Sequence, residues 1–222
     1  MSVSIWNSGE LPPSGFDERK GQYIIGRLKK GKVLLVGEGN LSFAASLINA
    51  GYIPPHGLVA STYEGRNSLS MDAVRTAVEL ERFGVETHHS VDARKLASHF
   101  PHRTFATIIF QFPHTGTRGS VMGRNPNFQL LRQFLISARS CLSPSGQVLV
   151  SHVDSHHYNG AFQFHEAATR TGFLPPRSLV FDRKFFPGYA HSMTHRPQSG
   201  LNAHRKLLTK VFKPDPRFRP KL

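Results

Sequence analysis

The feature that most constrains the fold is an apolar run that stops abruptly at two closely spaced glycines. The stretch KVLLVGEGNLSF covers residues 32–43, and its apolar part, 33–36, has the length of a short buried strand. Gly37 and Gly39 then permit a tight turn, and the small residues from Asn40 onward favour a helix. Such a unit brings backbone close to a ligand or to the packed chain itself. The turn alone leaves open whether a dinucleotide, a phosphate or another nucleoside cofactor binds there.

Strand-like runs alternate with helical patterns along the rest of the chain. The strand-like runs are 32–37, 58–62, 85–91, 105–112, 146–153, 178–185 and 205–212. The last two have no room for a crossover helix between them, so we expect an antiparallel hairpin there. The alternation before them favours parallel strands with crossover helices. We therefore predict an α/β fold with a doubly wound, mostly parallel sheet.

Three helices can be placed between these runs. Leu69, Ala73, Ala77 and Leu80 share one helical face, and Gly84 follows where a left-handed cap is wanted. A second helix occupies 125–142, with an asparagine at its N-cap and a proline at its first position. A third is expected to span 160–172.

Composition favours one globular domain with a polyanionic partner. The 222 residues carry 28 Lys and Arg against 14 Asp and Glu, a net charge of +14. A surplus of that size favours nucleic acid, because neutralised phosphates release counterions. The single Cys141 excludes an internal disulfide framework, and we expect no disulfide-linked partner. We expect an irregular arm over 1–25, the domain over 26–214, and a basic extended tail over 215–222.

The location expected from the residues is intracellular. No apolar run is long enough to cross a membrane, and the first twenty residues lack the layout of a secretory signal. Thirteen histidines invite a metal site, and short-spaced pairs occur at His88-His89, His156-His157 and His191 with His195. Of these three pairs only the last has a helical spacing, and Pro187 just before it disfavours a helix. We expect no metal.

Four segments follow predicted strands and should line one crevice, because ligands of open α/β sheets bind beyond the carboxyl ends of the strands. They are 37–40, 63–65, 92–93 and 111–114. Glu64 can accept hydrogen bonds from both hydroxyls of a ribose, and Asp92 from an adenine amino group. The alternative is that each carboxylate merely caps a following helix.

The residues at the end of the fourth predicted strand indicate which kind of nucleoside cofactor the site suits. A dinucleotide site is matched only in part, because Ser42 stands in the third glycine's place and Glu64 lies rather far along. The strand ends in an amide, an aromatic ring, a proline and an imidazole: Gln111, Phe112, Pro113 and His114. These groups suit a planar base read by edge hydrogen bonds and stacking better than hydride transfer. The alternative is that Phe110 and Phe112 simply pack in the core.

The motifs LLVGEGNLSFAASL, VDARKL, IIFQFPHTG and FFPGYAH, in this order, resemble a family of Rossmann-fold methyltransferases typified by the 25S rRNA uridine-N3 methyltransferase. The likeness runs from about residue 30 to 214. It implies S-adenosylmethionine as methyl donor, a seven-stranded sheet with an antiparallel last strand, rRNA or a pre-ribosome as partner, and a nucleolar location in a eukaryote. The cofactor residues it implies are Gly37, Glu38, Gly39, Asn40, Ser42, Phe43, Glu64, Asp92 and Ala93.

Two departures from the family pattern concern the substrate more than the cofactor. The family has asparagine where this chain has Gln111, and it continues with arginines where this chain has Ser192, Met193 and Thr194. Rival readings therefore stay open: a non-catalytic RNA-binding module, a small-molecule methyltransferase and a nicotinamide oxidoreductase.

Methylation of uridine N3 requires loss of the ring proton. His114 titrates near neutral pH and is the candidate base to test first. Its alternative role is to orient the loop while water takes the proton. The basic residues expected to meet RNA lie mainly in the loop after His114 and near the end of the chain: Arg118, Arg124, Arg183, Lys184 and Arg196.

Overall fold

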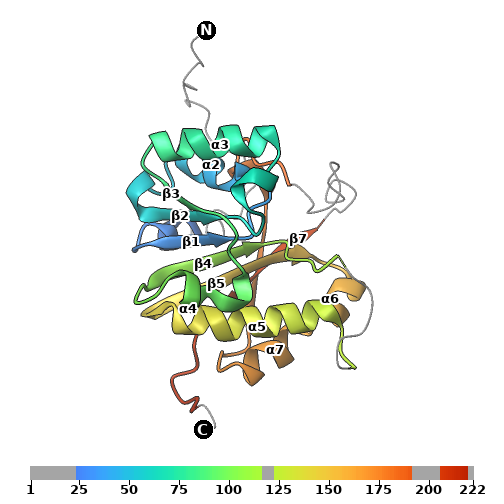
Figure 1. Ribbon diagram of the computed structural model, residues 1–222. Coiled ribbons are helices and arrows are strands. Elements are labelled where there is room, and N and C mark those ends of the chain that lie inside the picture. The colour runs from blue at the N-terminus through green and yellow to red at the C-terminus, as the bar shows by residue number, and fades with distance from the viewer. Residues whose placement is uncertain (1–23, 117–122, 192–205, 220–222) are drawn as a thin grey trace.

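The structure is a computed structural model that describes residues 24–116, 123–191 and 206–219 (Figure 1). Within these ranges seven strands form one sheet in the order β3-β2-β1-β4-β5-β7-β6. The strands are β1 Val33–Val36, β2 Leu58–Ser61, β3 Glu86–His88, β4 Phe105–Gln111, β5 Leu142–Val153, β6 Arg177–Val180 and β7 Leu207–Phe212. The first five run parallel, and β7 is antiparallel to both β5 and β6. The predicted doubly wound sheet with an antiparallel end is confirmed.

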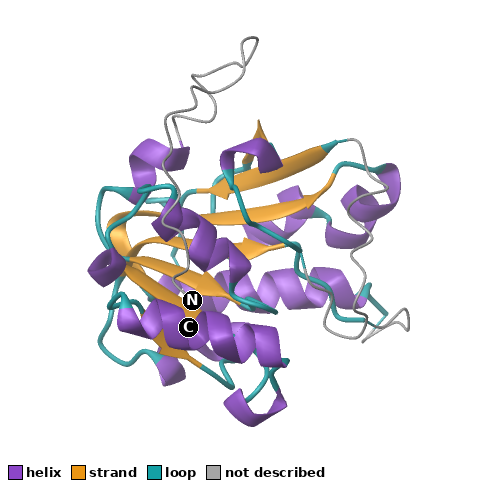
Figure 2. Ribbon diagram, turned by 90° about the horizontal axis from the view of Figure 1, so that it is seen from above, coloured by secondary structure: helices purple, strands orange, loops and turns teal. Residues whose placement is uncertain are grey.

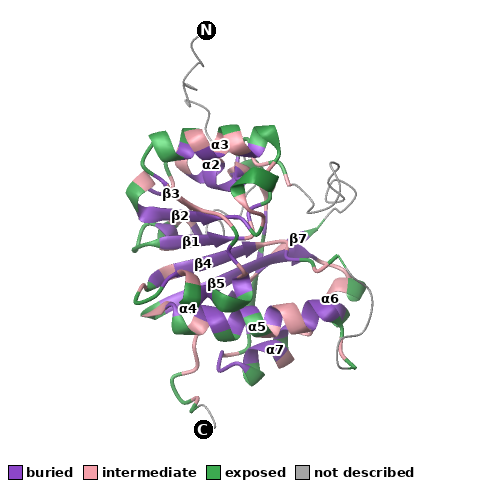
Figure 3. Ribbon diagram, in the orientation of Figure 1, coloured by how far each residue is buried: buried purple, intermediate pink, exposed green. Residues whose placement is uncertain are grey.

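Helices cover both faces of the sheet (Figures 1 and 2). The α-helices are α2 Ser42–Asn49, α3 Met71–Arg82, α4 Leu96–His99, α5 Pro126–Ser140, α6 His156–Phe162 and α7 Phe164–Arg170. Short 3-10 turns are η1 Pro55–Gly57, η2 Arg66–Ser68, η3 Ala93–Lys95 and η4 Arg183–Phe185. One hydrophobic cluster joins the sheet to α4, α5, α6 and α7, and a second joins it to α2 and α3. The buried strands between half-buried helices are visible in Figure 3.

The predicted positions of Gly84 after one helix and of Asn125 and Pro126 at the start of another are confirmed, whereas Leu69, expected on the face of the first helix, lies before its start at Met71. Ser70 accepts a hydrogen bond from the backbone N–H of Ala73 at the start of α3, and Gly84 follows the helix with φ +89°. Asn125 caps α5 by accepting from the backbone N–H of Asn127, and Pro126 takes the first helical position. The helix ends at Ser140, earlier than predicted, and Leu142 opens β5.

The prediction of one continuous helix over 160–172 was wrong. The chain forms α6 and α7 instead, separated by Gln163, which adopts the left-handed conformation with φ 46° and ψ 52°. The N–H of Gln163 still bonds to the carbonyl of Asn159, so α6 closes before the direction changes. A non-glycine residue in this conformation leaves no compositional mark, which is why periodicity missed the break.

Both ends of the described chain pack onto the domain. Ile24 and Leu28, in a helical turn at 24–28, are 8% and 1% exposed and belong to the α2–α3 cluster. Near the other end, the ring of Phe218 lies so close to Gly172 that a Cβ atom there would come within 2.5 Å. The guanidinium of Arg139 lies 5.0 Å from the centre of the same ring. Among the described helices none combines the length and apolarity that a membrane crossing needs.

Candidate active site

The four segments predicted to line a crevice follow β1, β2, β3 and β4, which are neighbours in the sheet. Backbone hydrogen bonds tie consecutive segments together. The N–H of Glu38 donates to the carbonyl of Ser61, and the N–H groups of Ser90 and Val91 donate to Glu64 and Thr62. The predicted gathering of these segments at the carboxyl edge of the sheet is therefore observed.

The first glycine of the turn is required by packing as well as by backbone conformation. Gly37 has φ +68°, and a Cβ atom there would lie 2.6 Å from Cε2 of Phe110. Phe110 itself is 9% exposed and packs edge-on against Phe134, with ring centres 5.0 Å apart. The close approach made by Gly37 is thus to the next strand of the sheet. Gly39 is exposed, where backbone is accessible to a ligand.

The acid between these glycines turns toward the helix that follows. Glu38 is 6% exposed, and its Oε2 accepts a hydrogen bond of 3.1 Å from the backbone N–H of Ala44 in the first turn of α2. Burial raises the pKa of this carboxyl from 4.5 to about 7, against the opposing effect of the N–H groups of Ala44 and Phe43. Glu38 therefore links the buried side of the glycine turn to the first turn of α2.

The remaining members of the expected cofactor loop contact a segment far along the chain. Asn40 Nδ2 donates to the carbonyl of Ala190 at 2.8 Å. Ser42 Oγ lies 2.9 Å from the same carbonyl, and it accepts from the N–H of Ala190 at 3.1 Å. The ring of Phe43 packs against Phe186 and Tyr189, with ring centres 4.9 and 5.2 Å apart. The motif FFPGYAH is thus the partner of the glycine turn, a pairing that sequence spacing does not reveal.

The two acids expected at the nucleoside differ in how they are engaged. Asp92 caps η3 by accepting from the N–H of Arg94, and its oxygens also pair with the Arg94 guanidinium at 2.8–3.1 Å. This pairing lowers the pKa of Asp92. Glu64 is half-buried, and the described residues offer its carboxylate no hydrogen bond or ion pair. The capping alternative holds for Asp92 and not for Glu64, because Gly65 occupies the N-cap of η2 without a side-chain bond.

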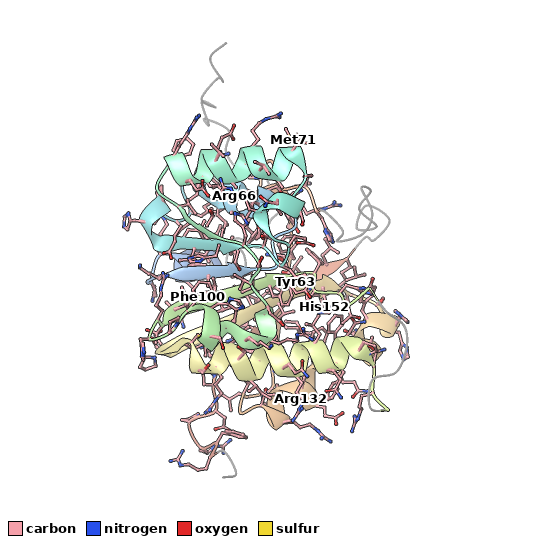
Figure 4. All side chains as sticks on the ribbon, in the orientation of Figure 1. Tyr63, Arg66, Met71, Phe100, Arg132 and His152 are labelled. Carbon is pink, nitrogen blue, oxygen red and sulfur yellow. The ribbon has the colours of Figure 1, made fainter. Side chains whose placement is uncertain are left out.

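A threonine and a histidine that sequence reasoning missed hold the loop of Glu64. Thr62 Oγ1 donates to the carbonyl of Glu64 at 2.7 Å and therefore accepts from Nδ1 of His89 at 2.8 Å. Beside them Ala93 is buried, whereas Tyr63 is 58% exposed at this end of the sheet (Figure 4).

The end of β4 brings an unsatisfied amide next to an aromatic stack. Oε1 of Gln111 is buried and has no hydrogen-bond partner in the described chain. Phe112 adopts φ 48°, which turns its ring to the side of the sheet opposite Phe110. There it stacks on His191, with ring centres 5.3 Å apart and planes 21° apart, and meets Phe181 edge-on.

The two residues after Phe112 start the loop that leads to α5. Pro113 is buried, and His114 is exposed. Nδ1 of His114 accepts a hydrogen bond of 2.8 Å from the N–H of Gly116, so the neutral ring carries its proton on Nε2.

The predicted RNA-binding residues fall into two groups. Arg118 and Arg196 lie outside the described residues, as does His195 of the suggested histidine pair. Arg124 is paired with Glu166 at 3.1 Å and lies 5.3 Å from the ring centre of Phe128. Arg183 and Lys184 lie in η4, close to the 186–191 segment. In the ranges that the structure describes, no three metal-binding side chains converge.

Residues 34–193 match the sequence model of the BMT5-like family, described as rRNA (uridine-N3-)-methyltransferase BTM5-like. The chain belongs to this family. The match covers the glycine turn, the two acids expected at a nucleoside, the end of β4 and the segment that contains Ala190. The predicted family is therefore confirmed.

Curated relatives contain the same region in chains of different length. The chain is 32% identical over 172 residues to a mouse (Mus musculus) protein named ferredoxin-fold anticodon-binding domain-containing protein 1 homolog, covering 71% of this chain and 27% of that one. An uncharacterized Arabidopsis thaliana protein is 28% identical over 170 residues, covering 71% of this chain and 79% of that one. The chain thus spans about a quarter of the mouse relative.

Solved structures share the fold at low identity. The N-methyltransferase NodS from Bradyrhizobium japonicum WM9 superimposes with a TM-score of 0.53 at 12% identity, covering 89% of this chain and 96% of that one. The DhpI–SAH complex gives 0.51 at 16% identity, covering 89% and 82%. The predicted Rossmann-like methyltransferase fold is confirmed.

Proposed function

We propose that this chain methylates N3 of a uridine in large-subunit rRNA and takes the methyl group from S-adenosylmethionine. Family membership supports the reaction class, and the net charge of +14 supports an RNA substrate. The observation that carries the proposal is the buried Oε1 of Gln111 at the carboxyl end of β4, to which no described residue donates a hydrogen bond. A buried acceptor without a donor costs roughly 1–3 kcal/mol, and the N3–H of a uracil is a donor that removes this cost.

The residues at the ends of β1, β2 and β3 fit an adenosyl group. The exposed backbone at Gly39 can approach it, and the carboxylate of Glu64, which has no partner among residues 24–116, 123–191 and 206–219, can accept from both ribose hydroxyls. An adenine amino group at Asp92 must share the carboxylate with Arg94, while the backbone of Ala93 lies beside it. When bound, S-adenosylmethionine supplies an electrophilic methyl group on a positively charged sulfur.

The protein's part in the chemistry is to orient uracil and to let its N3 proton leave. Gln111 can accept the N3–H hydrogen bond when the base enters, and this bond breaks when the N3 proton leaves, because the methyl group arrives at the same in-plane position of N3. Positioning of the base before that step contributes about 7–11 kcal/mol in well-oriented reactions. His114 remains the first candidate for the proton transfer. In the tautomer set by Gly116 its Nε2 donates, so the ring must exchange that proton before it acts as a base. Otherwise His114 orients the uracil oxygen and water takes the proton.

The decisive experiment uses bulk rRNA, S-adenosylmethionine and the purified chain, followed by digestion to nucleosides and mass detection. We expect a product that co-elutes with N3-methyluridine. Gln111→Ala should lower the yield by tenfold or more, because about 1.4 kcal/mol of lost orientation already gives that factor. The exposed Gln133→Ala is the matched control and should leave the yield unchanged. Methyl transfer to another position, or none, would refute the proposed reaction.

A second candidate, an RNA-binding module without catalysis, is favoured by Gln111 itself, because the family pattern has the shorter asparagine there. Gln111→Asn separates the two readings. If the chain is a binder that has lost activity, asparagine should create methylation where the native chain shows none. Stabilisation by S-adenosylhomocysteine but not by NAD would exclude the nicotinamide reading. For a eukaryotic chain, rRNA as substrate also predicts nucleolar localisation, which a fluorescent fusion would test.

A further inference from the structure

The segment 186–191 is fixed to the glycine turn at its backbone. Asn40 Nδ2 donates to the carbonyl of Ala190, and Ser42 Oγ accepts from the N–H of the same residue. Both peptide groups that flank Ala190 are thereby tied to the side chains of Asn40, just before α2, and Ser42, its first residue. We call these bonds between Asn40, Ser42 and Ala190 the latch.

Aromatic packing supports the latch on its buried side. Phe186 is 6% exposed and stacks on Phe181, with ring centres 5.1 Å apart and planes 12° apart. Phe43, from the second position of α2, packs against Phe181, Phe186 and Tyr189. The segment is thus anchored on both sides of Ala190 before it reaches His191.

The residue after Ala190 lies over the end of β4. His191 stacks on Phe112, the neighbour of Gln111, whose amide oxygen accepts no hydrogen bond from the part of the chain that the structure describes. Burial, and then the nearby charge of Arg183, lowers the pKa of His191 to about 4, so the ring is a neutral aromatic surface at neutral pH. A neutral, flat side chain of this kind suits a base that stacks, and stacking of one base on an aromatic residue is a common source of affinity for single-stranded RNA.

We propose that His191 forms the wall of the site against which the target base stacks, and that Asn40 and Ser42 are positioning residues that hold this wall through Ala190. This inference rests on the proposed function and names the base-contacting residue of that site. It also gives the glycine turn two tasks: its backbone faces the cofactor, while the side chains of Asn40 and Ser42 set the base wall. The two reactants are then placed by one rigid unit.

The latch can be tested without any substrate. In the native chain the imidazole signal of His191, assigned in NMR spectra with His191→Gln, should titrate near pH 4. In Ser42→Ala and Asn40→Ala it should move toward the ordinary value of 6.5, because the ring gains access to water. Ser42→Thr keeps the hydroxyl and should restore the native titration. Ser46→Ala is the matched control on the same helix, since the buried Ser46 hydroxyl has no partner in the described chain. An unchanged His191 titration in both alanine variants would refute the latch.

Calorimetry with S-adenosylhomocysteine separates the latch from direct cofactor binding. We expect Ser42→Ala and Asn40→Ala to bind it within about twofold of the native chain, because their side chains bond to Ala190. A tenfold loss of this affinity with an unchanged His191 titration would instead make Asn40 and Ser42 cofactor ligands.

The wall itself is tested with rRNA. His191→Ala should lower kcat/KM roughly tenfold or more through loss of stacking, whereas His191→Phe should keep most of it. A faster His191→Ala enzyme would show that the ring blocks the base site, and equal losses in both variants would argue against stacking. If the native chain forms no methyluridine at all, the proposed function fails, while the NMR and calorimetric results still decide the latch.

Discussion

Replacing Glu38 with glutamine should remove much of the pH dependence of this domain's stability between pH 5 and pH 8. Glu38 is 6% exposed beneath the glycine turn, and burial raises its pKa from 4.5 to about 7. The folded state therefore keeps a proton that the unfolded chain has already released. The stability linked to this proton is fully present below pH 4.5 and is lost as the pH rises through 7.

The magnitude follows from the gap between the two pKa values. That gap corresponds to about 3 kcal/mol of unfolding free energy, and about 2.5 kcal/mol of it falls between pH 5 and pH 8. Glutamine has the shape of the protonated side chain, and its amide oxygen can still accept from the N–H of Ala44. The Glu38→Gln variant should therefore exceed the native chain in stability by about 2–3 kcal/mol at pH 8 and by less than about 1 kcal/mol at pH 5.

Urea unfolding of both proteins at the two pH values measures this difference. Other titrating groups, such as the buried His152, act alike in the two chains and cancel when the native and variant curves are subtracted. The exposed Glu79→Gln serves as control and should shift the curve by the same amount at both pH values. If native and Glu38→Gln proteins lose stability in parallel from pH 5 to pH 8, Glu38 is already ionised in the folded chain and the reasoning fails.

Three further predictions follow from the same geometry. Gly37→Ala should cost about 2–4 kcal/mol in urea unfolding, because it combines positive φ with a 2.6 Å approach to Phe110; Gly160→Ala, in open space, should be neutral or slightly stabilising, and equal effects would refute the packing argument. Asp92→Asn should weaken S-adenosylhomocysteine binding roughly tenfold in calorimetry. Arg94→Ala should change it little, and the reverse ranking would make Arg94 the contact. RNA affinity should fall with salt at a log–log slope of about 0.7 per phosphate contact, and a flat response would remove the electrostatic argument.

Local chemistry explains why so much of the fold could be predicted. The strand-like runs are short and apolar, and every predicted one is a strand in the sheet. Gly84 after α3, and Asn125 with Pro126 at the start of α5, mark helix ends through bonds and backbone angles that depend on a few neighbouring residues. The break at Gln163 could not be predicted, because a positive φ at a residue other than glycine depends on the packing around it.

The site was predictable as a set of segments but not as a set of contacts. The order of parallel strands places the ends of β1 to β4 side by side, so the meeting of these four segments follows from topology. Which atoms a side chain contacts depends on residues that are far away in the sequence. Asn40 sits beside the glycines and suggests a cofactor contact, yet its hydrogen-bond partner lies at Ala190. Asp92 shows the same limit. The sequence places Arg94 two residues away, but it does not reveal whether the two side chains form an ion pair, as they do in the structure.

The bond between Asn40 and Ala190 spans 150 positions of the chain. On a translating ribosome the first partner emerges on the order of 10 s before the second. A nascent chain can thus complete β1 and α2 long before the segment 186–191 is available to pack against them. A nucleoside that binds early therefore meets an incomplete site. The chain becomes able to select a base only near the end of its synthesis. Chains that are truncated before Ala190 should therefore lack methylation activity even when their first half folds.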